Sequence, residues 1–337
     1  MVIERELVAE RHVAEVCRAA MPDEGNATSL AARRITKHFP SRGHPFVAVN
    51  DLSFELAAGE SVAFLGPNGA GKSTTIKILC GILTPTSGHA EIGGFPAGSQ
   101  HANRQLGLVF GTRSQLFMHM TVGQCLDLIA EIYFLSGKPK RRRIADLTEL
   151  FEIGSLVESR VRTLSLGQRM RCEVVAALLH QPKVLLADEP TIGLDVIAKN
   201  KLRELVLRWQ REEKSTFLLT SHDLSDVEAL CGRCILIDRG VKRFDGPLAA
   251  LKGDFSDLRR VQITVSDRSV VPLTDEVAIR SVGQEPFIHR YETRTRDMPM
   301  AEVLSRLCRH YGDGLQDIQV SEVGLEEVLA HHYSGRA

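Results

Sequence analysis

Residues 66–74 read Gly-Pro-Asn-Gly-Ala-Gly-Lys-Ser-Thr and match the phosphate-binding pattern G-x-x-x-x-G-K-[ST]. Such a loop brings backbone N–H groups onto phosphate oxygens. Lys72 is expected to reach the β and γ oxygens, Ser73 to offer its hydroxyl to Mg²⁺, and a helix at 73–83 to point its positive end at the anion. The sequence therefore predicts a nucleoside triphosphate site, whose candidate residues are Gly66, Pro67, Asn68, Gly69, Ala70, Gly71, Lys72, Ser73 and Thr74.

Acidic side chains and a histidine follow further apolar runs. The run at 184–187 ends in Asp188 and Glu189, and the run at 216–219 comes shortly before His222. Parallel strands place their ligand chemistry at their carboxyl ends, and an apolar run at 61–65 leads into the phosphate-binding loop in the same way. Asp188 can hold Mg²⁺ through water, and Glu189 can orient an attacking water.

A third motif, Leu-Ser-Leu-Gly-Gln at residues 164–168, opens an apolar-periodic run that predicts a helix at 169–180. A Ser-x-Gly sequence at a helix start is a further anion-facing geometry. The loop at 66–74 already fills the phosphate positions of its own subunit. Ser165 and Gly167 are therefore expected to meet a nucleotide held by a second subunit.

In this order the motifs resemble the ATP-binding cassette ATPases of membrane transporters, over about residues 30–250. The resemblance implies that 66–74 is the Walker A motif and 184–189 the Walker B motif with Glu189 as catalytic glutamate. It also implies that 164–168, including Gln168, is the signature motif, 193–195 the D-loop with Asp195, and His222 the switch histidine. The implied fold is an α/β P-loop NTPase of the ABC type, with a parallel core sheet, an antiparallel β subdomain and a helical subdomain at about 113–165.

Three positions leave questions within this resemblance. The signature reads LSLGQ rather than the commoner LSGGQ, with Leu166 in the centre and little functional cost expected. The usual Q-loop glutamine is replaced by Thr112, by Gln115 three residues later, or by neither. Phe39 falls where the family stacks an aromatic ring on adenine, although it can also be a core phenylalanine.

Composition limits the function classes. The 42 Lys and Arg residues balance the 42 Asp and Glu residues, so the net charge gives no sign of a nucleic-acid partner. No window approaches the roughly 18 consecutive apolar residues that span a bilayer, and the opening MVIERELVAERHV is too charged for a secretory signal. A cytosolic chain that reaches the membrane through a partner is expected.

The chain is expected to have three parts. Residues 1–27 form an extension, helical or partly disordered, 28–254 the ATP-binding domain, and 255–337 a small α+β accessory domain. The accessory domain is predicted to alternate strands at 261–265 and 318–320 with helices at 300–311 and 325–330. In the helical subdomain, helices are predicted at 122–135 and 142–151, with a basic break at 137–143 that suits a solvated helix start or contact with anionic lipid.

Two smaller features have alternative interpretations. Cys231 and Cys234 form a lone C-x-x-C, for which core packing is favoured over redox or metal chemistry because structural metal sites usually need a second pair. The loop-like stretch 112–122 carries Phe117, Met118 and Met120. These three side chains either pack the helical subdomain or line a groove that receives a helix of a membrane partner.

Two function classes fit these motifs: a transporter ATPase, and a soluble cassette ATPase acting on DNA or ribosomes. The chain has a single ATPase domain, and only a compact helical segment lies between its Walker A and signature motifs. Both features favour the transporter ATPase. The stretches 110–116 and 164–171 look like a subgroup, broadly exporters, that pairs with six-helix permeases of the ABC-2 type. The implied cofactors are ATP and Mg²⁺, and the implied partners are a second copy of the chain and a separate permease at the cytoplasmic face of the cell membrane.

Overall fold

The computed structural model describes residues 28–40, 45–255, 257–268, 270–274, 278–325 and 328–329. The predicted extension at 1–27 lies outside these residues. The chain divides into two compact units between Asp245 and Gly246. The short helix α9 (Leu248–Lys252) thus belongs to the second unit, although the predicted domain boundary follows residue 254. The predicted division into an extension, an ATP-binding domain and an accessory domain stays a prediction.

A six-stranded sheet in the order β10-β9-β3-β8-β7-β6 forms the centre of the first unit. Its strands are β3 (Ser61–Leu65), β6 (Leu106–Phe110), β7 (Val184–Asp188), β8 (Thr216–Thr220), β9 (Arg233–Asp238) and β10 (Val241–Pro247). The strands from β9 to β6 pair in parallel. They are continuous apolar runs because helices cover both faces of such a sheet. Parallel pairing brings the segments that follow β3, β7 and β8 to one edge.

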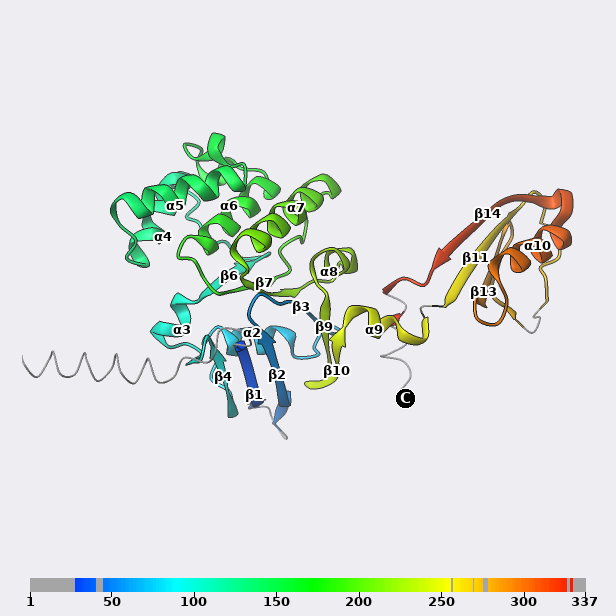
Figure 1. Ribbon diagram of the computed structural model, residues 1–337, viewed down its shortest axis with the longest axis horizontal. Helices are drawn as coiled ribbons and strands as arrows, with labels where there is room; N and C mark the ends of the chain where they lie inside the picture. Colours follow the sequence, from blue (N-terminus) through cyan, green and yellow to red (C-terminus); the bar gives the residue numbers. More distant parts are fainter. Residues whose placement is uncertain are drawn as a thin grey trace, which may run out of the picture. The chain divides into compact units, whose positions relative to one another are not determined.

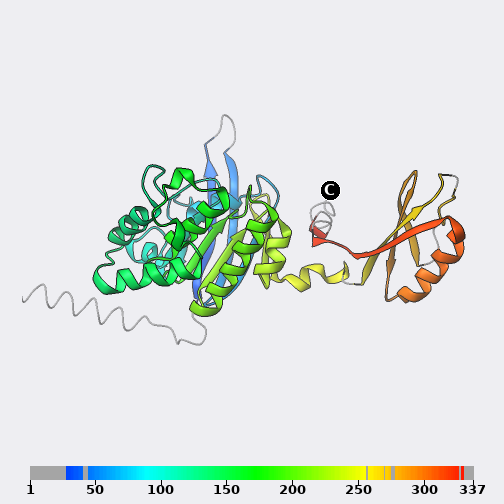
Figure 2. The same ribbon diagram turned by 90° about the horizontal axis from the view of Figure 1, so that it is seen from above.

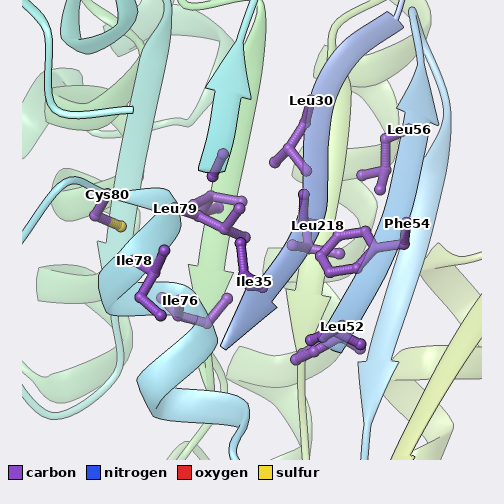
Figure 3. Packing of buried hydrophobic residues seen from close by; sticks show 14 of the residues in the cluster. Leu30, Ile35, Leu52, Phe54, Leu56, Ile76, Ile78, Leu79, Cys80 and Leu218 are labelled. Atoms are coloured by element: carbon purple, nitrogen blue, oxygen red, sulfur yellow. The ribbon is translucent and has the colours of Figure 1, made fainter. Parts of the chain in front are cut away.

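A second, antiparallel sheet carries strands β1 (Thr28–Phe39), β2 (Phe46–Ala57), β4 (Ser87–Ile92) and β5 (Phe95–Pro96). One apolar cluster joins it to the parallel sheet and to helix α2 (Lys72–Leu79). Figure 3 shows Leu30, Ile35 and Phe54 of this sheet gathered with Leu79 of α2 and Leu218 of β8. Each such buried side chain contributes about 1.5–3 kcal/mol through burial. In Figure 2 the β1–β2 pair extends beyond the helices of this unit.

The remaining helices of the first unit are α3 (Gln100–Arg104), α4 (Val122–Ile132), α5 (Gly137–Leu150), α6 (Leu166–Leu178), α7 (Val196–Glu213) and α8 (Leu224–Leu230). Helices α4 and α5 lie beside α6 and apart from β1, β2 and β4 (Figure 1). This arrangement gives the antiparallel, parallel and helical parts that the sequence implied. Among the described residues, no helix is both long and apolar enough to cross a membrane.

Several helix ends differ from their predictions, each for a local reason. Helix α2 spans Lys72–Leu79 rather than 73–83, because the chain turns at Gly81 with φ 69°. Helix α4 ends at Ile132 rather than at residue 135, since Phe134 adopts φ 60° and Leu135 N donates to Ala130 O at 2.8 Å.

Helix α5 also differs, because it begins at Gly137 and includes the predicted basic break at 137–143. Pro139 is tolerated there because the first turn of a helix does not use its N–H groups. Lys140 lies 2.9 Å from Asp127 and 3.0 Å from Glu131, and Arg143 pairs with Glu213 and donates to Leu178 O. Part of the basic run therefore fastens α5 to its neighbours instead of facing solvent.

The second unit is a four-stranded antiparallel sheet, β12-β13-β11-β14, with helix α10 (Met300–Tyr311). Its strands are β11 (Leu258–Val265), β12 (Ile279–Glu285), β13 (Ile288–Arg294) and β14 (Leu315–Glu322). The predicted helix at 300–311 and the strands near 261–265 and 318–320 are confirmed. The predicted strand–helix–strand–helix order is wrong, because β12 and β13 form an additional hairpin. The predicted final helix at 325–330 lies partly outside the described residues.

A buried histidine in the first unit gives a pH-dependent contribution to stability. His180 stacks on Tyr133 with ring centroids 3.8 Å apart, and its Nε2 lies 3.0 Å from Leu106 O. Burial lowers the pKa of His180 to about 4. As the pH falls below 6.5, His180 is protonated in the unfolded chain but stays neutral in the folded protein. This difference lowers the free energy of unfolding by about 2 kcal/mol between pH 7 and pH 5.

Denaturant titrations of the wild type and of His180→Asn at both pH values measure this contribution. The variant is expected to show a smaller loss of stability between pH 7 and pH 5 than the wild type. Equal losses in the two proteins would assign the pH dependence to other groups.

Candidate nucleotide site

The phosphate-binding loop has the backbone shape that its glycines imply. Gly69 has φ 79° and Gly71 has φ 106°, a region that side chains disfavour. A Cβ at Gly71 would lie 2.5 Å from Ala48 O, and one at Gly66 would lie 2.5 Å from Ile237 O. The loop is also fastened to its surroundings, since Gly240 N donates to Ala70 O at 2.9 Å. Only glycine fits at 66 and 71, as a loop that closes tightly around phosphates requires.

Lys72 begins α2 and turns back over its own loop. Its Nζ donates to Gly66 O at 2.6 Å and to Pro67 O at 3.2 Å. Burial lowers the pKa of Lys72, while the charges of Glu189 and Asp188 act in the opposite direction. The charges of these carboxylates act on Lys72 because α2 lies beside β7. Lys72 and the backbone of this loop fit a polyphosphate group, which carries the negative charge that they balance.

Asp188 and Glu189 are held at the end of β7 by the neighbouring strand. Thr220 Oγ1 on β8 donates to Asp188, and Glu189 N donates to Thr220 O at 2.9 Å. Glu189 has φ 54°, so its side chain leaves the strand in a direction that an extended backbone would not give. Its Oε1 lies 2.8 Å from Nε2 of His222. The structure thus brings together Lys72, Asp188, Glu189 and His222, while Ser73 and Thr74 lie in the first turn of α2.

The 164–168 motif forms the start of α6 in a different part of the unit from α2 (Figure 1). Ser165 caps α6 and accepts from Gln168 N at 3.2 Å, and Gln168 Oε1 accepts from Ser165 N at 2.9 Å. This capping box starts α6 three residues before the predicted residue 169. Both the side chain and the backbone N–H of Gln168 are therefore used in the cap.

The 164–168 motif lies beside the segment that carries Asp195. A Cβ at Gly193 would lie 3.0 Å from Leu166 Cδ2, and one at Gly167 would lie 2.9 Å from Ala198 Cβ. Asp195 caps α7 by accepting from Ala198 N at 2.8 Å. The central leucine of LSLGQ thus packs over Gly193, which explains how this position accommodates a larger side chain than glycine.

The two candidates for the Q-loop position are placed differently. Gln115 Nε2 donates to Leu108 O of β6, and Gln115 N donates to the buried Glu173 of α6 at 2.9 Å. Thr112 is exposed just after β6. Gln115 would have to leave Leu108 before its amide could reach a nucleotide, so both assignments stay predictions.

Phe39 ends β1 opposite Phe46 of β2, and Lys37 Nζ lies 5.5 Å from its ring centroid. Phe39 is half-buried and is not part of the buried core. Its placement suits a ring that takes part in binding rather than in packing. Cys231 and Cys234, by contrast, are buried in the fold, and burial raises the pKa of the Cys234 thiol to about 12. Their burial supports packing as their role.

Sequence reasoning missed the polar residues that hold these loops. Thr220, Thr191, Asp226 and Glu173 are all buried and hydrogen-bonded around the site. The only sequence signal was their position within a few residues of a recognised motif. They come from segments far apart in the chain, so their contacts follow from the tertiary fold.

Comparisons with known proteins agree with this geometry. Residues 49–192 match the family model described as ABC transporter. The chain is 34% identical over 218 residues to the ABC transporter ATP-binding protein NatA of Bacillus subtilis, covering 64% of this chain and 88% of that protein. It is 31% identical over 310 residues to the linearmycin resistance ATP-binding protein LnrL of the same organism, covering 89% of this chain and 96% of that protein.

A solved structure described as the ATP-binding subunit of an ABC transporter superposes with a TM-score of 0.60 at 29% identity, covering 68% of this chain and 93% of that one. A dimeric ATP-binding cassette bound to ADP and phosphate superposes with a TM-score of 0.58 at 24% identity, covering 65% and 98%, and supports the fold alone. The predicted ABC-type fold is therefore confirmed. The chain belongs to the ATP-binding subunits of ABC transporters, and it is an ATPase whose hydrolysis of ATP is coupled to transport across a membrane.

Proposed function

We propose that two copies of this chain close head to tail around two MgATP and drive export through a separate permease of the ABC-2 type. The observation that carries this proposal is the separation, within one subunit, of the 66–74 loop from the 164–168 motif. The first turn of α6 lies apart from the phosphate-binding loop of its own chain (Figure 1), so this helix start suits the γ-phosphate held by a partner.

The surface beside the 164–168 motif has the character of an interface. Ile192, Val196 and Ile197 are 43%, 72% and 83% exposed and flank Asp195. Exposed β-branched apolar side chains at a helix start are covered favourably by a second protein surface. In a two-fold dimer, this patch on each subunit would contact the nucleotide-binding face of the other subunit. The two equivalent contacts would close the assembly.

Within each site the residues have separate proposed roles. Lys72 and the backbone of 66–74 bind the phosphates, Ser73 and Asp188 hold Mg²⁺ with water, and Phe39 stacks on the adenine. Thr112 or Gln115 contacts the metal or its water, and Ser165, Gly167 and Gln168 with Asp195 complete the site from the partner. Mg²⁺ supplies neutralisation of phosphate charge when bound. Glu189 accepts a proton from the attacking water, and His222 holds the Glu189 carboxylate in place.

Light scattering on the Glu189→Gln protein with saturating MgATP tests assembly. The slow variant keeps its ATP and is expected to shift from monomer to dimer, because both composite sites stay filled. Ser165→Arg, which places a bulky cation at the proposed partner contact, is the matched control and is expected to remain monomeric. A monomer in both proteins, also in the presence of the permease, would contradict the head-to-tail arrangement.

The export direction and the partner rest on similarity. The relatives include a linearmycin resistance protein and, at 36% identity over 207 residues, a doxorubicin resistance ATP-binding protein of Mycobacterium tuberculosis. We therefore place the chain at the cytoplasmic face of the membrane, bound to its permease. The alternative, a soluble cassette acting on DNA or ribosomes, is not favoured, because relatives that align over most of this chain are named as transporter or resistance subunits.

A further inference from the structure

A buried carboxylate, Asp226 in the first turn of α8, joins the loop that follows Glu189 to the loop that carries His222. Its side chain is fully buried. One of its oxygens, Oδ2, accepts from Thr191 Oγ1 and also from Ser221 Oγ, the latter at 3.0 Å. Thr191 lies two residues after Glu189, and Ser221 directly precedes His222. A single oxygen atom therefore ties the two loops together.

The second oxygen of Asp226 is held from α7. Arg203 donates to Oδ1 through Nε at 2.5 Å, and its Nη2 also donates to Ser225 Oγ at 2.7 Å. A buried carboxylate keeps a fixed position only where its charge is compensated and its lone pairs are used, and Arg203 with the two hydroxyls provides both. Helix α7 spans Val196–Glu213 with Asp195 as its N-cap, so Arg203 connects Asp226 to the helix that starts at the segment expected at the dimer interface.

The contact that depends on this network is the one between Glu189 Oε1 and His222 Nε2, at 2.8 Å. The parallel pairing of β7 with β8 ends at Asp188 and Thr220, and beyond it the Glu189 backbone is held by its N–H, which donates to Thr220 O at 2.9 Å. Glu189 and His222 lie beyond the paired residues, in loops. The hydroxyl bonds to Asp226 add a restraint between the two loops, because they fix Thr191 relative to Ser221. Reacting groups must be held to within about half an ångström for full activity.

We propose that Asp226 is a positioning residue for ATP hydrolysis, acting through Thr191 and Ser221 to hold Glu189 against His222. The proposal rests on the catalytic role proposed for Glu189. Asp226 itself is not expected to touch the nucleotide. Loss of either hydroxyl bond should thus lower kcat while leaving the binding of ATP unchanged.

Thr191→Val is the sharpest test, because valine has the shape of threonine without its hydroxyl. Steady-state ATPase assays on the full chain with MgATP are expected to show kcat lowered about tenfold, with KM for ATP within about twofold. Thr191→Ser restores a hydroxyl and is expected to recover most of kcat. Thr148→Val is the matched control: it removes another buried hydroxyl, which bonds Ala145 O at 2.9 Å inside α5, and should leave kcat unchanged.

Thr191→Val in a His222→Ala background separates a positioning role from a general loss of structure or activity. If Thr191 acts through the Glu189–His222 contact, Thr191→Val should add less than about a twofold loss there. An equal tenfold loss in both backgrounds, or an unchanged kcat in the single variant, would overturn the proposal. Ser221→Ala provides a second route to the same result if Thr191→Val fails to fold. An inactive Glu189→Gln beside a fully active Thr191→Val would reject this inference alone, whereas an active Glu189→Gln would reject the proposed catalytic role.

Discussion

Replacing Glu189 by glutamine is expected to lower the rate of ATP turnover by about a hundredfold or more, the usual scale for loss of a positioned base. Glutamine keeps the size of the side chain, and its amide oxygen can still lie near His222 Nε2, which is 2.8 Å from the carboxylate in the wild type. The variant lacks only the basicity that accepts a proton from water. Phosphate release and retention of labelled ATP after gel filtration measure the two expected effects, slow turnover and trapped nucleotide.

Two further variants identify the step that is lost. Lys72→Ala should weaken ATP binding itself, because it removes the buried cation that neutralises the phosphates, and should therefore trap no nucleotide. Glu149→Gln, on the exposed side of α5, removes a carboxylate far from the site and should turn over ATP normally. Near-normal ATPase activity of Glu189→Gln would remove Glu189 from the catalytic role.

The strands that carry this chemistry could be predicted closely from the sequence. The run expected at 61–65 coincides with β3, and the runs at 184–187 and 216–219 each fall one residue short of β7 and β8. Buried parallel strands are continuous apolar runs that end abruptly in glycine or acidic residues. Their pattern therefore locates both the strand and the residues that follow it.

Helix boundaries were harder, because capping contacts determine them. Ser165 and Gln168 exchange hydrogen bonds and start α6 before the apolar period becomes evident at residue 169. Helix α4 ends just before Phe134, which adopts a left-handed backbone conformation. Phenylalanine is uncommon in that conformation, so its position gives no signal of a helix end. Apolar periodicity alone contains neither signal.

The hairpin β12–β13 was missed because its inward-facing residues on β13 are polar. His289, Tyr291 and Thr293 are 2% or less exposed and alternate with charged residues. Tyr311 on α10 bonds both His289 Nδ1, at 2.7 Å, and Tyr291 OH. His289, Tyr291 and Tyr311 hydrogen-bond to one another, which lowers the cost of burying them. A search for alternating apolar residues interprets such a strand as loop.

The last expectation concerns coupling to the membrane partner. Phe117→Asp is expected to leave folding and ATP binding intact but to abolish transport and co-purification with the permease. Phe117 is 52% exposed, whereas its neighbour Leu116 is buried at 4% and packs the subdomain. For Phe117, the structure thus disfavours the interpretation that it packs the core. An exposed phenylalanine in the segment after β6 suits a groove that receives a short helix of the permease, where a new carboxylate would be desolvated without a partner.

The backbone around Phe117 explains why folding should survive this change. Arg162 N donates to Met118 O at 3.1 Å, and Val161 N donates to Met120 O at 3.0 Å, so backbone pairing on the side of 160–162 holds the segment. Phe134→Asp is the matched control, since Phe134 is 74% exposed in the same helical part but lies after α4. It should keep transport. Full transport by Phe117→Asp and Met118→Asp would place the coupling surface elsewhere, and failure of both to fold would show that these side chains belong to the core, because a charge on an exposed contact surface costs the isolated fold little.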